Sequence, residues 1–480
     1  MIRRLLRNPW FLFVLALLVA LPVWWFADDA LGERHWREYA AEARARGVKL
    51  TTDEMLPPQG FPDGENYAGS PFWKDVAAHP NDPGWAIPSL SPPSGRFTRE
   101  DRNAFSPRRD LAGWRTSMIS ANWLPASDTQ GSDPEAVLRG LQKAREPLAA
   151  IRLSTAKPHI YIPLAWSPDA QLQQPYLGAA IRLAKLVSLK CAAETALGRS
   201  QEALASWKDG IGLLRVVNTT PNLISGLIAH AIEYHSLVAL KEGIAARIWN
   251  DTDLQEIQHL LSEQSPLGCY RDELNGERTC ENALLENPKF RERLRLVIGK
   301  PLNFLGRLQL NHQRTWRELQ IYLNRAMDEE LGRLDADANV CRPLTNHIYG
   351  AKVVTRDTGS AWAAMVEAFL PSLNDLSQRA TYQHARMRMA VLACALERFR
   401  LAHGKYPATL VDLVPEFTAT LPVDPCGGSS FHYRLSEKSG YMIYSVGTDG
   451  QDDGGTGENL HHTKGDWWWD GPEPPKQSPQ

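Results

Sequence analysis

The feature that most constrains this chain is an apolar, uncharged run from Trp10 to Phe26, with three arginines (Arg3, Arg4 and Arg7) before it and two aspartates after it. A run of this length lies near the lower limit for a helix that crosses a hydrocarbon core of about 30 Å. Basic residues on its N-terminal side favour an orientation with the N-terminus in the cytoplasm. We therefore expect a cytoplasmic tail (residues 1–9) and a transmembrane signal anchor (residues 10–27).

The same run is also compatible with a signal peptide that is removed after export. The small residues of a cleavage site are missing, because Pro22, Trp24 and Trp25 stand where alanines would be expected. We favour an uncleaved anchor and keep the cleaved signal peptide as the alternative. In either case the expected location is the inner (cytoplasmic) membrane or beyond it, with the bulk of the chain in the periplasm or otherwise outside the cytoplasm.

Composition narrows the possible partners. The chain has 480 residues, of which 43% are hydrophobic and 22% charged, and its formal net charge is −2. Such a length predicts two or three domains of roughly 150 residues each. Nucleic-acid binding normally rests on a basic surface, so we expect no nucleic-acid partner. The membrane itself and other envelope or secretion-system proteins are the expected partners.

Six cysteines are few for a disulfide scaffold of this size, and no CxxC motif is present. An oxidising compartment would nevertheless allow bridges. Cys269 and Cys280 are near enough in the sequence to be a disulfide candidate. We expect the other four to be small core residues.

Three segments follow the anchor. Residues 28–132 are expected to form a juxtamembrane helix and an extended arm rich in proline and glycine, whose many aromatic residues indicate packing on the next domain. Residues 133–370 show helical periodicity, with Asp133 placed to cap a first helix and Gly198 placed to end a helix within a hairpin. This middle segment is predicted to be an α-helical exported domain.

The last segment, residues 375–480, changes character. A long amphipathic helix is followed by Gly404, a short second helix, a β-hairpin in "FHYRLSEKSGYMIYSVG" and an acidic, glycine-rich loop. The fold class is therefore predicted to be mainly α, with a C-terminal α+β module made of a long helix and a small antiparallel sheet.

The order of these motifs resembles the major pseudopilins of bacterial type II secretion systems (general secretion pathway protein G). The resemblance is carried by "FRLAHGKYP", "LPVDPCGGSSFHY" and "YMIYSVGTDGQDDGGTGEN", which occur in family order and at close to family spacing over about the last fifth of the chain. In the family, the apolar segment continues directly into the long helix, whereas here it lies far upstream and has no pseudopilin processing site. The resemblance thus implies a pseudopilin-like head on another scaffold, without the family's mode of filament assembly.

The resemblance also implies a calcium site in the acidic loop. Calcium prefers six to eight oxygen ligands on a tightly bent backbone. Alignment with the family makes Asp449 the first ligand and puts Glu458 or Asn459 near the later ones, with Asp453 or Asp452 as an additional carboxylate. Without the resemblance, an acidic solvated loop that binds no metal would be the better interpretation, and it stays open.

Two other segments contain side chains that could bind a metal ion or stack on an aromatic or sugar ring. His230 and Glu233 share a helical face, but the spacing to His235 matches no zinc motif, so we expect no metal there. The three adjacent tryptophans from Trp467 to Trp469 cannot all face one core, and we expect a terminal strand or tail packed on the C-terminal module.

These observations predict a membrane-anchored cell-envelope protein that serves interaction or assembly, possibly in secretion. No nucleophile elbow, phosphate loop or dinucleotide fingerprint is present, so we do not expect an enzyme. The alternative is an exported hydrolase with its site in the helical domain.

Overall fold

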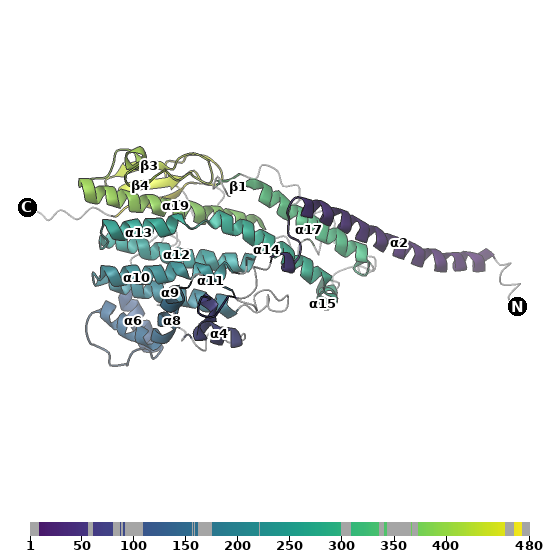
Figure 1. The fold of residues 1–480 in the computed structure, drawn as a ribbon, viewed down its shortest axis with the longest axis horizontal. Coiled ribbons are helices and arrows are strands. Elements are labelled where there is room, and N and C mark those ends of the chain that lie inside the picture. Colours follow the sequence, from purple (N-terminus) through teal and green to yellow (C-terminus); the bar gives the residue numbers. More distant parts are fainter. Residues whose placement is uncertain are drawn as a thin grey trace, which may run out of the picture. The chain divides into compact units, whose positions relative to one another are not determined.

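The fold was analysed in a computed structural model of the 480-residue chain. The structure describes residues 9–55, 61–79, 87, 90–91, 109–155, 157, 159–161, 175–219, 221–298, 309–335, 340–342, 366, 373–456 and 465–472. The described part is mainly helical and has a small antiparallel sheet near its C-terminal end (Figure 1), which confirms the predicted fold class.

The chain divides into two compact units. Unit 1 comprises residues 1–56, 275–332 and 344–374, and unit 2 comprises residues 57–274, 333–343 and 375–480. Unit 1 contains α2 (Pro9–Ala45), α3 (Thr52–Met55), α15 (Pro288–Ile298), α17 (Gln313–Arg333) and the second part of α14 (Pro266–Glu286). The predicted helical segment 133–370 contributes to both units.

Helix α2 begins as an exposed apolar helix. Its side chains around Trp10, Phe13 and Leu18 are largely exposed, although they are among the most apolar in the chain. The helix is long and apolar enough to cross a membrane. The juxtamembrane helix expected after residue 28 is its continuation, so that one helix runs without a break from the apolar run to Ala45.

The polar half of α2 packs within unit 1. Tyr39 lies in a small core with Leu50 and Ile321. Its hydroxyl donates to Asp328 Oδ2 on α17 at 3.1 Å, and the guanidinium of the fully buried Arg278 donates to Asp328 Oδ1 at 2.7 Å. Carboxylates that accept several charge-assisted bonds fix the helices that carry them. The C-terminal half of α2 is therefore an integral part of unit 1.

Unit 2 has a helical part and a C-terminal α+β part. The helical part consists of η1 (Tyr67–Gly69), α4 (Pro71–Ala78), α6 (Leu111–Ser120), α7 (Asp133–Leu141), η2 (Gln142–Ala144), α8 (Arg145–Thr155), α9 (Pro175–Ala196), α10 (Ser200–Gly212), α11 (Leu214–Val217), α12 (Leu223–Ala246), α13 (Asp251–Ser262) and the start of α14. The α+β part consists of α19 (Leu373–His403), η5 (Leu410–Leu413), β3 (His432–Ser436), β4 (Gly440–Ser445) and β5 (Trp467–Asp470), and a two-residue ladder joins β1 (Leu334–Asp335) to β2 (Val340–Cys341).

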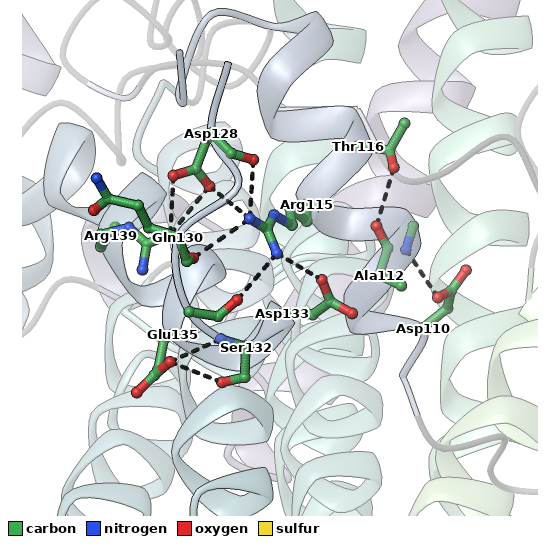
Figure 2. A network of polar contacts seen from close by, with 12 residues as sticks. Asp110, Ala112, Arg115, Thr116, Asp128, Gln130, Ser132, Asp133, Glu135 and Arg139 are labelled. Atoms are coloured by element: carbon green, nitrogen blue, oxygen red, sulfur yellow. Dashed lines mark hydrogen bonds and ion pairs between the residues drawn. The ribbon is translucent and has the colours of Figure 1, made fainter. Parts of the chain in front are cut away.

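The start of α7 differs from the sequence prediction by one residue. Ser132, not Asp133, is the N-cap, and its backbone N–H donates to Glu135 Oε2 at 2.8 Å. The Asp133 carboxylate instead accepts from Arg115 at 3.1 Å, within a polar network that also holds Asp128 (Figure 2). Asp133 was misassigned because its pairing with Arg115 on α6 is a tertiary contact, which a local capping pattern does not report.

The predicted helical hairpin is present as α9 and α10, with Gly198 between them at a φ of 68°. Aromatic residues of the preceding arm reach the same core, because Tyr67 and Trp73 are buried in it. The arm is not entirely irregular, since Pro71 begins the short helix α4.

Helix α19 connects the two parts of unit 2. On one side its Arg398 donates to Asp251 at the start of α13 at 2.9 Å. On the other side Tyr382 meets Trp467 of β5 edge to face, with ring centroids 5.1 Å apart. Figure 1 shows α19 between α13 and the sheet. One hydrophobic core contains residues from α9, α10, α12, α13, α19, β4 and β5, so the α+β part shares its core with the helices.

The sheet has the order β3-β4-β5 and is antiparallel throughout. Strand β5 contains the three tryptophans. Trp467 and Trp469 are buried, while Trp468 between them is half-buried, as the two-residue period of a strand requires. The expectation of a terminal strand packed on the module is therefore confirmed.

Candidate cation-binding loop

The pseudopilin-like motifs build a frame around the acidic loop. Gly404 ends α19 at a φ of 74°, and Tyr406 then turns back so that its hydroxyl donates to Glu397 Oε1 at 2.7 Å. The Tyr406 ring lies over the start of β4, where a Cβ on Gly440 would come within 2.6 Å of it. The motif around "GKYP" therefore fixes the sheet on the end of the long helix.

The "LPVDP" turn fixes the other end of β4. Asp424 is completely buried, and its Oδ1 accepts from the backbone N–H of Cys426 at 3.0 Å and from the Ser445 hydroxyl at 2.8 Å. Its Oδ2 accepts from the N–H of Val446 at 3.2 Å. Three donors satisfy a carboxylate that burial would otherwise make costly. Asp424 thereby fixes Val446, the residue between β4 and the acidic loop. The sequence did not predict this role.

The loop proper starts with a sharp bend. Gly447 has a φ of 66°, and a Cβ at this position would lie 2.4 Å from the carbonyl oxygen of Gly465. Only glycine fits such a left-handed residue in close contact with backbone. Asp449 joins the same two segments, because its Oδ1 accepts from the N–H of Gln451 at 3.1 Å and its Oδ2 from the N–H of Gly465 at 3.1 Å.

Asp466 is the most unusual residue of the loop. Only 3% of it is exposed, and its Oδ2 accepts from the N–H of Gly455 at 2.7 Å. Its other carboxylate oxygen, Oδ1, is buried and has no hydrogen-bond partner among the described residues. Burial raises the pKa of Asp466, the backbone N–H groups of Gly455 and Asp453 partly offset this rise, and the nearby carboxylates of Asp452 and Asp453 add to it. A buried, unsatisfied carboxylate oxygen beside two other acids is where a bound cation would be most stabilising.

The predicted ligands are only partly described. Asp449 and Asp453 lie in the described part of the loop, whereas Glu458 and Asn459 lie outside the described residues. No group of three or more acidic, histidine or cysteine side chains with metal-binding geometry occurs in the part of the chain that the structure describes. Asp466 was not among the predicted ligands, although its position directly before a buried strand could have indicated it.

The oxygens present are of the kind that a hard cation prefers. Asp449, Asp453 and Asp466 supply carboxylates, and the backbone carbonyl of Asp453 accepts from the Thr456 hydroxyl at 2.6 Å. Calcium takes carboxylate and carbonyl oxygens in flexible geometry, whereas zinc and iron prefer nitrogen and sulfur. The donor set therefore fits calcium better than a transition metal.

The predicted disulfide candidate is not supported. Cys269 and Cys280 both lie on α14, eleven residues apart, and their thiols are unbridged. A helix rises about 1.5 Å per residue, which separates their Cα atoms by roughly 16 Å, whereas a disulfide requires less than about 7 Å. Closeness in the sequence was misleading because the intervening residues are helical.

Comparison with known proteins identifies the C-terminal module. Residues 373–463 match the family model described as type II secretion system (T2SS), protein G. The match begins with α19 and covers the Tyr406 motif, the Asp424 turn, β3, β4 and the acidic loop, and it confirms the resemblance derived from the motifs. Searches of curated proteins and of solved structures found no match.

Proposed function

We propose that this chain is an inner-membrane protein of the bacterial cell envelope whose pseudopilin-like module serves interaction or assembly linked to type II secretion. The match of residues 373–463 to the secretion protein G family is the observation that carries the proposal. The matched segment forms one compact part of unit 2, since α19 and the sheet share one hydrophobic core.

The exposed start of α2 supports a membrane anchor. Large apolar side chains such as Trp10 and Phe26 are about three-quarters exposed. Water-exposed apolar patches of this kind usually mark a membrane or a protein interface. Three arginines precede the run, so we propose a single span with its N-terminus in the cytoplasm and both units in the periplasm.

The position of α19 argues against a filament subunit that packs through this helix. Between Ala385 and Leu396 nearly every side chain of α19 is buried in the core of unit 2. Helices of the same chain and the sheet already cover it. We therefore propose that the module presents its sheet and loop to partners, while the helix is used internally.

Calcium is proposed to stabilise the acidic loop. Asp449 and Asp466 would hold the ion together with Asp453, Glu458 and Asn459, and the ion would offset the repulsion between these acids. The unsatisfied Oδ1 of Asp466 supports this proposal, because it gives one ligand a buried atom that lacks a donor among the described residues.

The rival function, an exported hydrolase, finds less support. A groove of about 570 Å³ in unit 2 contains Ser262 and His259 beside Arg388. The Ser262 hydroxyl donates to the backbone carbonyl of His259 at 2.7 Å, not to its ring, and Arg388 donates to the carbonyls of Ser262 and Gln264. These polar groups hold the end of α13 and do not form a nucleophile with a base. The matched family is non-enzymatic as well.

The proposal is tested by identifying partners in native membranes. The tagged full-length chain is cross-linked, extracted in detergent and purified, and the recovered proteins are quantified by mass spectrometry. We expect components of the type II secretion system to be enriched at least about tenfold over a control, an unrelated single-pass protein with the same tag. Enrichment of no secretion component would refute the proposed link to secretion.

A further inference from the structure

Two cysteines from distant parts of the sequence meet beside the pseudopilin-like turn. Cys341 ends β2, and Cys426 lies in the turn that follows Asp424. The backbone N–H of Cys341 donates to the carbonyl oxygen of Pro425 at 2.9 Å. Both cysteines belong to unit 2, and they are not bridged in the structure. The hydrogen bond therefore joins the strand directly to the residue before Cys426.

This hydrogen bond limits the distance between the two cysteines. The Pro425 carbonyl and the Cys426 N–H belong to one planar peptide, so the lengths of standard peptide bonds place the two Cα atoms within about 7 Å of each other. Disulfides occur at Cα separations of about 4.4–6.8 Å, and larger ones require backbone movement. Cys341 and Cys426 thus satisfy the distance condition that Cys269 and Cys280 fail.

The two thiols also lie in different surroundings. The pKa of Cys426 is raised, first by burial and then by the Asp424 carboxylate, and the Cys341 sulfur is near enough to contribute as well. Cys341 is 6% exposed, whereas Cys426 is only half-buried, at the edge of the exposed turn that continues through Gly427. Cys426 is therefore the less buried residue of the pair, next to an exposed turn.

We propose that Cys341 and Cys426 form a disulfide when the protein meets a disulfide oxidant. The thiolate of the more accessible Cys426 attacks the external disulfide and releases one thiol, and the Cys341 thiolate then displaces the second. The two cysteines lose two protons and two electrons, and the external disulfide becomes two thiols. That this happens in the cell rests on the proposed export of unit 2, because the cytoplasm keeps thiols reduced.

The disulfide would join β2, which precedes α19 in the chain, to the turn that follows Asp424. Between Cys341 and Cys426 lie α19, Tyr406 and the turn held by Asp424. Closing this long segment restricts the unfolded chain much more than the folded one, which stabilises the fold. The cross-link would thus secure the module outside the cell's reducing compartment.

The test uses the purified full-length chain in detergent. It is equilibrated in a mixture of oxidised and reduced glutathione, quenched with acid, alkylated and digested without reduction, and linked peptides are identified by mass spectrometry. We expect peptides that join Cys341 to Cys426, at least about tenfold more abundant than any other pair and lost after treatment with dithiothreitol. Peptides containing Cys269 and Cys280 serve as the internal control and should stay alkylated.

A second measurement does not depend on peptide recovery. The oxidised protein should unfold a few degrees higher than the reduced protein, and Cys426→Ser should abolish the difference. In Cys341→Ser, Cys426 should retain a glutathione adduct, because the displacing thiol is gone. If Cys341 and Cys426 of the folded wild-type chain remain alkylated or carry only glutathione, the proposal is wrong.

Export is tested separately by alkylating thiols in intact cells before lysis. A pair that is linked in the purified protein but reduced in cells would place unit 2 in the cytoplasm and overturn the proposed location, while the assignment of the pair would stand.

Discussion

At the scale of single residues, Glu233 is a buried acid whose charge is strongly affected by folding. It lies in the middle of α12, fully enclosed, and its Oε2 has no hydrogen-bond partner among the described residues. Burial raises its pKa from the ordinary 4.5 to about 8, although the Arg386 guanidinium opposes the shift. The pKa of Glu273 on α14 is raised as well, chiefly by burial. These acids are therefore expected to be protonated in the folded protein at neutral pH.

The raised pKa predicts a pH dependence of stability. Folded Glu233 keeps its proton up to about pH 8, whereas in the unfolded chain it ionises near 4.5. Unfolding between these values releases a proton, so stability should fall as the pH rises, by up to about 1.4 kcal/mol per pH unit. We expect Glu233→Gln to unfold at higher denaturant than the wild type at pH 8, and the difference to shrink towards pH 5.

The matched control is Glu437→Gln, because Glu437 is an exposed glutamate in the β3–β4 turn. This variant should leave the stability profile unchanged. A Glu233→Gln difference that is the same at pH 5 and pH 8 would show that the substitution acts by packing and not by charge.

At the scale of elements, the acidic loop gives the next prediction. If it binds calcium, the ion stabilises the folded state by about 2.7 kcal/mol at one hundred times the dissociation constant. Thermal unfolding of the full-length chain should therefore shift upward with calcium relative to a chelator. Asp449→Ala should lose most of this shift, because it removes one ligand and part of the attraction for a divalent ion.

The full-length chain is the appropriate sample, since an isolated 375–480 fragment would expose the face of α19 that the helices of unit 2 cover. Glu437→Ala is the control, because it also removes one carboxylate from the C-terminal module, but from the β3–β4 turn and not from the acidic loop. If the protein unfolds cooperatively and its midpoint is the same with calcium and with chelator, the loop does not bind calcium and is a solvated acidic turn.

Elements with strong local patterns could be predicted from the sequence, and their tertiary partners could not. The hairpin β3–β4, the end of α19 at Gly404 and the helices α9 and α10 follow from periodicity and turn residues. The role of Asp466 and the closeness of Cys341 to Cys426 depend on contacts between residues far apart in the chain. Cys269 and Cys280 were paired from their closeness in the sequence, which says little about the distance in space until the intervening helix is known.

At the scale of the whole molecule, the exposed apolar start of α2 predicts topology. The run from Trp10 to Phe26 contains no charged residue, and the basic residues before it should stay in the cytoplasm. An alkaline phosphatase fused after Gln480 folds only in an oxidising compartment and should be active, whereas a β-galactosidase at the same site should be inactive. Replacing Arg3, Arg4 and Arg7 by glutamine should reduce the phosphatase activity, because these charges set the orientation.

Sequencing the mature N-terminus then distinguishes an uncleaved anchor from a cleaved signal peptide, since a chain that starts near Asp28 has lost the apolar run. Strong β-galactosidase activity of the C-terminal fusion would instead place both units in the cytoplasm and contradict the proposed location.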